Sequence, residues 1–159
     1  MKKETNKFQT KFIKDPCIAY NYAVNILRKR FPEGEKAIAK DPEYAFEYAF
    51  HIIKGRWPEA EPTIAKNAVN AYFYAREIIN DRFPEGELAI AKDPEYAYYY
   101  ALDIIKGPWV KGEQAIARNP WCSYYYARYV IKGRFPEAEK IILNSKYKNK
   151  YKKLLTFAE

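Results

Sequence analysis

The chain contains few of the residues that build active sites and metal centres. Among 159 residues there are one histidine, two cysteines and six glycines. A zinc site needs clustered His and Cys ligands and a phosphate-binding loop needs clustered glycines, and the sequence has neither pattern. His51 stands alone, and we expect it to be a solvated side chain. We therefore expect no enzyme, no metal site and no cofactor.

Long apolar runs are absent as well. No stretch approaches the roughly 18–20 residues that a membrane-spanning helix needs, and no apolar segment follows the basic start to form a secretory signal. Cys17 and Cys122 belong to distant parts of the repeat described next, so we expect no disulfide between them. These absences predict a cytoplasmic protein that works without a membrane.

What the chain has is a repeat. Units open at Asp15, Asp41, Asn67, Asp93 and Asn119, each 26 residues after the last, and Ser145 opens a broken sixth. A fixed period of about 20–50 residues is typical of a solenoid, in which each unit packs on its neighbours. The sequence predicts an all-α solenoid of five helix-turn-helix repeats over residues 15–144. Residues 1–14 form a basic extension or cap, and residues 145–159 form a basic capping helix.

The unit that opens at Asp93 illustrates the two helices. Asp93 is a candidate N-cap and Pro94 suits the first helical position. Lys106 lies in the last turn and Gly107 follows as a C-terminal cap, so the first helix is predicted over residues 94–106. The second helix begins at the proline of Arg-Phe-Pro-Glu or Arg-Trp-Pro-Glu in the other units. Acidic residues fill its first turn, where the helix dipole favours them.

Spacing predicts the core. Ala97, Ala101, Ile104 and Ile105 fall on one face of the first helix, and Tyr100, of the recurring Tyr-Ala pair, flanks that face. The aromatic residue before each second helix anchors the turn in the core. These residues are Phe31, Trp57, Phe83, Trp109 and Phe135, and the second helices contribute Ile38, Ile64, Ile90, Ile116 and Ile142.

Two segments depart from the pattern. In the segment 107–111 the proline comes two places early, so we expect a local change in the turn. In the broken sixth unit Lys152-Lys153 replaces the Tyr-Ala pair. The apolar contacts of the capping helix are predicted to be Tyr147, Tyr151, Leu154, Leu155 and Phe157.

The net charge of +8 lies entirely in the two ends. Residues 1–14 and residues 145–159 each hold five lysines and one acid, which leaves 18 basic and 18 acidic residues between them. A nucleic-acid-binding solenoid would carry a basic stripe along the array. Basic ends can still bind phosphate without sequence preference, or can simply keep the terminal units soluble.

The positions that vary between units are free of the packing constraint. Those 2, 6, 9 and 13 residues after each opening residue fall on one stripe of the first helix, opposite the predicted core. The candidate binding residues on this stripe are Phe50, Phe73, Arg76, Tyr99, Leu102, Trp121, Tyr125 and Arg128, with Val69 beside them. We call these nine residues the outer stripe.

Exposed aromatic surface with arginine typifies a protein-binding face, so a protein partner or self-association is the leading interpretation. Burial of the stripe by the superhelix is an alternative. Nucleic-acid binding, through the basic ends and bases stacked on the rings, is another. A fourth is sequestration of a small nucleotide-like ligand.

The repeat also resembles a known type of sequence. The stretches 56–66 and 82–106 carry the pattern R-[FW]-P-E-[GA]-E-x-x-I-A-K-D-P-E-Y-A best. It resembles short tandem repeats of uncharacterised proteins of bacteriophages and other large DNA viruses. The resemblance covers about residues 15–144 and carries no catalytic residue. It implies a viral origin and an interaction role, such as inhibition of a host defence or replication factor.

Overall fold

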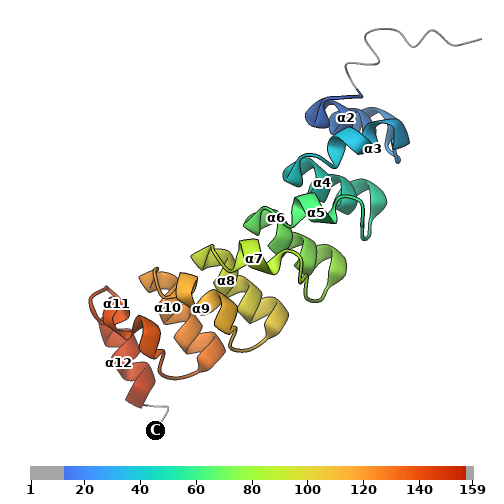
Figure 1. Ribbon diagram of the computed structural model, residues 1–159. Coiled ribbons are helices and arrows are strands. Elements are labelled where there is room, and N and C mark those ends of the chain that lie inside the picture. The colour runs from blue at the N-terminus through green and yellow to red at the C-terminus, as the bar shows by residue number, and fades with distance from the viewer. Residues whose placement is uncertain (1–12, 157–159) are drawn as a thin grey trace, which may run out of the picture.

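The computed structural model describes residues 13–156, and this part of the chain is helical with no strand. Helix pairs stack in chain order into an elongated array whose two ends lie far apart (Figure 1). The first helix of each unit contacts its own second helix and the first helix of the next unit. The chain is therefore an α-solenoid, as the repeat predicts. The first helices are α2 (Pro16–Asn21), α4 (Pro42–Tyr48), α6 (Ala68–Phe73), α8 (Pro94–Tyr100) and α10 (Pro120–Tyr126), and the second are α3 (Pro32–Ile38), α5 (Glu61–Ile64), α7 (Glu87–Ile90), α9 (Val110–Ile116) and α11 (Glu139–Leu143).

Each first helix begins at a side-chain cap, as predicted. The carboxylate of Asp93 accepts hydrogen bonds from the backbone N–H groups of Glu95 (2.9 Å) and Tyr96 (3.0 Å). The Asp or Asn that opens every other unit accepts in the same way. These bonds satisfy backbone donors that would have no partner inside the helix. The opening residue of each unit therefore sets where its first helix starts.

Each first helix continues into a π-helical turn, which the sequence did not reveal. These turns are Tyr22–Leu27, Ala49–Ile53, Tyr74–Ile79, Ala101–Ile105 and Ala127–Ile131. Each turn ends at a residue in the left-handed conformation, such as Lys106 at φ 57°. The prediction that Gly107 caps the helix is therefore wrong: the wider turn lets the N–H of Lys106 reach the carbonyl of Ala101, so the chain reverses one residue earlier.

The second helices are short and less uniform. α3 begins at its proline, as predicted, whereas the α-helical part of α5 and α7 begins three residues later, after a turn. In the last unit a 3₁₀ turn, Pro136–Ala138, precedes α11. The early proline at Pro108 does not shorten its unit, because α9 starts at Val110, in the same register as Pro32. Helices this short depend on packing for their stability.

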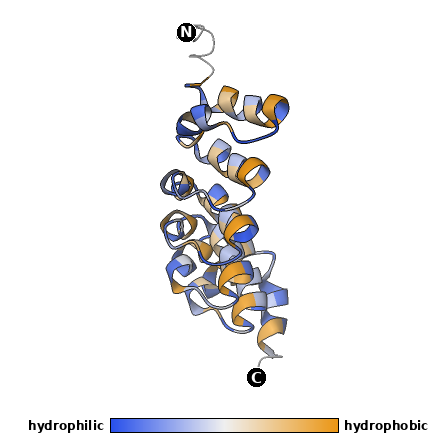
Figure 2. Ribbon diagram, turned by 90° about the vertical axis from the view of Figure 1, so that its right-hand side faces the viewer, coloured by the Kyte–Doolittle hydropathy of each residue, from blue (hydrophilic) through white to orange (hydrophobic). Residues whose placement is uncertain are grey.

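The core combines small and large side chains. Ala97 and Ala101 are fully buried, whereas Ile104 and Ile105 are half-buried because they lie in the π-helical turn. Tyr100, expected only to flank the core, is fully buried. The aromatic residues before the second helices are buried, except the half-buried Phe31, and the predicted core isoleucine of each second helix is 0% exposed. Apolar residues recur in every unit along the stack (Figure 2).

The stack closes on α12 (Lys148–Thr156), which packs against α11. Tyr147 and Tyr151 are buried, and Leu154 and Leu155 are half-buried against the core. Phe157 and the predicted extension over residues 1–12 lie outside the described residues. None of the helices within residues 13–156 has the length and apolar character needed to cross a membrane.

Candidate functional site

A hydrogen-bond network joins each unit to the next, and it decides how the first helices are placed. Between α6 and the preceding unit, the Tyr74 hydroxyl donates to the Glu61 carboxylate (2.9 Å) and accepts from the backbone N–H of Trp57 (2.7 Å). Two N–H groups of Arg56 bind the same carboxylate, each at 2.8 Å. The Tyr74 ring packs on Phe83 of its own unit, with centroids 5.3 Å apart. The tyrosine thus belongs to one unit and bonds to the one before.

The regular junctions share this network, which we call the junction network. Its members are Arg30, Phe31, Glu35 and Tyr48; Arg56, Trp57, Glu61 and Tyr74; and Arg82, Phe83, Glu87 and Tyr100. Burial raises the pKa of Tyr48 and of Tyr100 to about 12. The hydrogen bond from Arg56 holds the pKa of Glu61 below its usual value. The network therefore needs neutral tyrosine and ionised glutamate.

Two junctions differ. Pro108 stands where the other units have arginine, so among residues 13–156 Glu113 accepts from the Tyr126 hydroxyl alone, at 2.8 Å. The local change expected at residues 107–111 is thus a lost ion pair. Nearby, the buried Trp109 Nε1–H has no acceptor among the described residues.

At the C-terminal end the hydroxyl of Tyr151, not a residue of the Lys152-Lys153 pair, accepts from the N–H of Phe135 (2.9 Å). Tyr151 lies one position before the repeat register. The capping helix therefore supplies the acceptor for this N–H with a tyrosine that the register alone does not identify, although within residues 13–156 its hydroxyl forms no bond to Glu139.

The outer stripe lies along the first helices and shares no residue with the junction network. Phe50 and Val69 are 41% and 36% exposed, and Arg76 and Arg128 are exposed. The other five stripe residues are half-buried: Phe73, Tyr99, Leu102, Trp121 and Tyr125. They pack against the edge of the core and do not point directly away from it. The residue that follows each opening residue by 13 positions does not belong to the stripe. It ends the π-helical turn in the left-handed conformation.

Contacts between aromatic rings join the stripe into one ladder. Tyr99 lies 6.2 Å from Trp121, and Trp121 lies 4.9 Å from Tyr125, measured between ring centroids. At the other end, Phe50 reaches Phe73 through Phe46, over distances of 6.0 and 6.2 Å. Leu102 and Val69 form no ring contact and fill the surface beside the ladder. The ladder therefore runs unbroken from the second unit to the cap.

The inner edge of this ladder was missed from the sequence. It consists of one buried ring per unit from the second to the fifth: Phe46, Tyr72, Tyr98 and Tyr124. Tyr96 links Tyr72 to Tyr99, and Tyr147 of the cap stacks on Tyr124. A signal was available, because the position five residues after the opening residue is aromatic in each of the five complete units.

Both stripe arginines lie over neighbouring rings. The Arg76 guanidinium is 5.0 Å from the centroid of Phe73, donates to the Tyr72 hydroxyl (2.8 Å) and pairs with Glu77. Arg128 lies 5.1 Å from the centroid of Tyr129 and donates to Tyr124 (3.1 Å). Stacking on rings and hydrogen bonding fix long side chains that would otherwise be mobile.

Two hollows open between the second and third units. The larger, of about 510 Å³, is lined by Glu43, Phe46, Glu47, Asn67, Val69, Asn70 and Phe73. The smaller, of about 190 Å³, is lined by Phe50, Lys54, Gly55, Glu77 and Ile78. Stripe residues thus contribute walls to both hollows.

The described residues show no grouping suited to metal binding. His51 lies 3.0 Å from Glu47 on the helix surface. Cys122 is buried, and desolvation raises the pKa of its thiol to about 12, so the nucleophilic thiolate is disfavoured.

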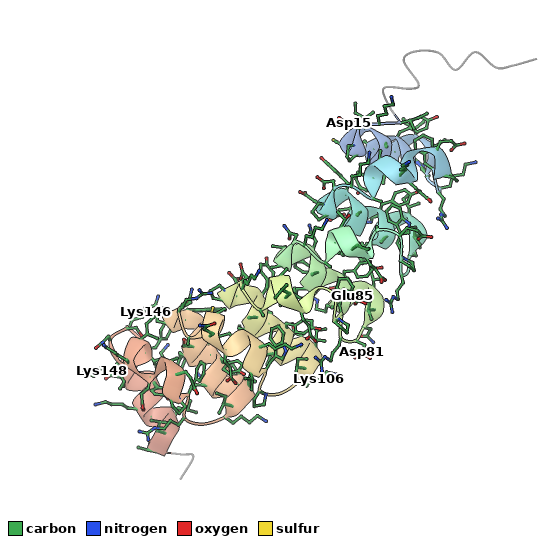
Figure 3. All side chains as sticks on the ribbon, viewed as in Figure 1. Asp15, Asp81, Glu85, Lys106, Lys146 and Lys148 are labelled. Carbon is green, nitrogen blue, oxygen red and sulfur yellow. The ribbon has the colours of Figure 1, made fainter. Side chains whose placement is uncertain are left out.

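Among the described residues, basic side chains of the C-terminal segment lie at the end of the ladder, where the Lys146 ammonium is 5.4 Å from the centroid of the Tyr147 ring. Lys146 and Lys148 project from the C-terminal end of the stack, and Asp15 marks the opposite end (Figure 3). The candidate surface itself combines rings with two engaged arginines. Comparison with protein-family models, curated proteins and solved structures finds no match to this chain.

Proposed function

We propose that the chain is a non-enzymatic scaffold that binds a protein partner through the outer stripe. The observation that carries the proposal is the continuous, partly exposed ring ladder on positions that differ between units. The junction network accounts for the residues that recur, but it does not involve the stripe. Trp, Tyr and Arg are the residues most enriched among binding hot spots, and the stripe supplies all three.

The stripe is also preorganised for binding. Trp121 is held between Tyr98 at 5.6 Å and Tyr125 at 4.9 Å, so little side-chain freedom is left to lose when a partner docks. A smaller loss of side-chain conformational entropy on binding generally increases affinity. A rigid helix face of this kind suits a partner that presents a complementary apolar surface.

Nucleic acid is a poorer match to this surface. Arg76 and Arg128 are already bonded to tyrosine hydroxyls, and the repeats have no net charge. Phosphate binding depends on free cationic groups and weakens steeply with salt. The host partner that the viral resemblance implies stays a prediction.

The test is capture of a partner from nuclease-treated bacterial lysate. We expect Trp121→Ala with Tyr125→Ala to abolish capture of the protein retained by the unaltered chain, while the helical circular dichroism signal persists. Phe50→Ser and Arg128→Glu are surface variants that should weaken capture without affecting folding. Leu88→Ala is the matched control, because Leu88 is apolar and 71% exposed but lies off the stripe.

Two results would count against the proposal. If the Leu88 variant loses capture as the stripe variants do, the stripe is not the binding face. If capture disappears between low and moderate salt and depends on intact nucleic acid, the partner is a polyanion and not a protein.

A further inference from the structure

The larger hollow lies where the third unit has a small polar residue in place of the ring that two other units have. Three residues after the opening residue stand Tyr44 in the second unit and Tyr96 in the fourth. Tyr96 packs on Tyr72 (5.6 Å) and Tyr44 on Tyr20 (5.5 Å). The third unit has Asn70 at this position, and the space between α4 and α6 stays open. The hollow is thus a local departure from the repeat.

The walls of the hollow are aromatic and its lining includes two carboxylates. Phe46 and Phe73 lie 6.2 Å apart with their planes inclined by 32°. Glu43 and Glu47 lie on the same helix as Phe46, one turn apart. Glu43 forms no ion pair within residues 13–156, and Glu47 contacts only His51 among charged partners there. Ring faces together with carboxylates attract cations.

Asn70 contributes an amide without a partner. It is 8% exposed, so more than nine-tenths of it is buried, and it lines the hollow. Its backbone N–H bonds to Asn67 (3.1 Å), but its side-chain amide makes no hydrogen bond in the described part of the chain. Solvent in the hollow reaches the amide atoms, because Trp109 Nε1 is the one side-chain N or O atom among the described residues that is both fully buried and without a partner. A ligand that donates hydrogen bonds would satisfy the amide oxygen.

We infer that this hollow binds the guanidinium group of an arginine side chain. A guanidinium is planar, stacks on rings and donates several hydrogen bonds, so it suits the phenyl faces, the carboxylates and the amide oxygen together. Phe73 already receives Arg76 in this manner, at 5.0 Å, and Glu77 pairs with the Arg76 charge. The assignment of the arginine to a protein partner rests on the proposed function, whereas the cation site itself does not.

The site is tested without any partner. We expect Nα-acetyl-argininamide to shift the backbone NMR signals of residues 43–47 and 67–73 in a saturable manner. Nα-acetyl-citrullinamide has nearly the same shape but no charge, and we expect it to bind at least about tenfold more weakly, the factor that corresponds to the loss of one charge-assisted hydrogen bond.

Variants locate the site. Asn70→Tyr places in the hollow the residue that the chain itself has at Tyr44 and Tyr96, and should abolish the shifts while the fold persists. Glu43→Gln with Glu47→Gln should weaken binding at least about tenfold. Glu95→Gln is the matched control: Glu95 occupies the register of Glu43 two units further on but does not line the hollow, and no change is expected.

The inference is overturned if the arginine probe gives no saturable shift, if citrulline binds equally well, or if binding survives Asn70→Tyr. These outcomes leave the proposed function standing, because its own test depends on Trp121 and Tyr125. Conversely, a partner captured equally well by the Asn70→Tyr chain would show that the partner's arginine does not occupy the site.

Discussion

Tyr99 and Tyr100 are adjacent in α8, yet they belong to opposite regions of the molecule. Tyr100 is 0% exposed, and its hydroxyl accepts from the N–H of Phe83 in the preceding unit (2.9 Å). Tyr99 is half-buried in the ring ladder, and its hydroxyl makes no hydrogen bond within the described residues. The junction network recurs almost unchanged along the stack, whereas the outer stripe differs from unit to unit. We propose that the invariant positions serve stability and that the variable positions serve recognition.

The largest expected effect is that of deleting a junction ring. Tyr100→Ala leaves a cavity and removes the acceptor of a buried N–H, and should lower the free energy of unfolding by about 3–5 kcal/mol. Tyr99→Ala should lower it by about 1 kcal/mol. Urea unfolding followed by circular dichroism measures both. Equal losses would contradict the division into two regions.

A smaller effect isolates the hydroxyl group. Tyr74→Phe keeps the ring but leaves the N–H of Trp57 without its acceptor and removes one of the donors to Glu61, and should cost about 1–3 kcal/mol. Tyr125→Phe is the control, because the Tyr125 hydroxyl has no hydrogen bond in the described structure, and should change stability by less than about 0.5 kcal/mol. If Tyr74→Phe leaves the free energy of unfolding unchanged, ring packing alone joins the units.

The pH dependence should report on the junction network. The pKa of Glu35 and of Glu61 is lowered in the folded chain, by hydrogen bonds from Arg30 and Arg56 respectively. Their stabilisation is present above the ordinary Glu pKa of about 4.3 and is lost as the pH falls below it. Melting temperatures measured from pH 7 downward should fall in that range.

At alkaline pH the same linkage works through tyrosine. Burial raises the pKa of Tyr48 and of Tyr100 to about 12 in the folded chain. Their contribution is complete below about pH 10, where tyrosine ionises in the unfolded chain, and is lost as the pH rises toward 12. The Tyr100→Phe chain should lose less stability between pH 10 and 12 than the unaltered chain. If both chains lose the same stability, the groups that titrate between pH 10 and 12 do not include Tyr100.

The smallest effect concerns the exposed arginines of the junction network. Arg56→Met should lower stability only slightly, as expected for a solvent-exposed partner of an ion pair. Arg82→Met should cost less, because Lys111 also binds Glu87, at 2.8 Å. Adding Lys111→Met to Arg82→Met should lower stability as much as Arg56→Met does. Strict additivity of the Arg82 and Lys111 changes would show that the two cations do not substitute for each other.

Much of the architecture could be predicted from the sequence because its signals are local. The N-cap of Asp93 and the start of α3 at Pro32 depend on backbone groups within a few residues. The π-helical turns have no comparable local signal in the sequence. Because of such a turn, the residue in the left-handed conformation is Lys106 and not the predicted Gly107. The same turns changed which residues share a helix face, so Ile104 and Ile105 are less buried than an α-helical spacing predicts.

The candidate site was predicted less completely. Spacing selected Trp121 and Tyr125, which do lie together in the ladder. It did not select Phe46 or the hollow beside Asn70, because both result from contacts between neighbouring units. A hollow is a missing contact across a unit boundary, and no residue within either unit alone indicates it.

The sequence by itself determined the period, the helix starts and the separation of constant from variable positions, because these follow from local backbone chemistry and from comparing the units. Only the tertiary structure decided what the constant tyrosine does. Its hydroxyl bonds to a backbone N–H 17 residues earlier, in another unit, as Tyr74 does to Trp57. A buried donor needs an acceptor, and stacking of the units decides which side chain supplies it.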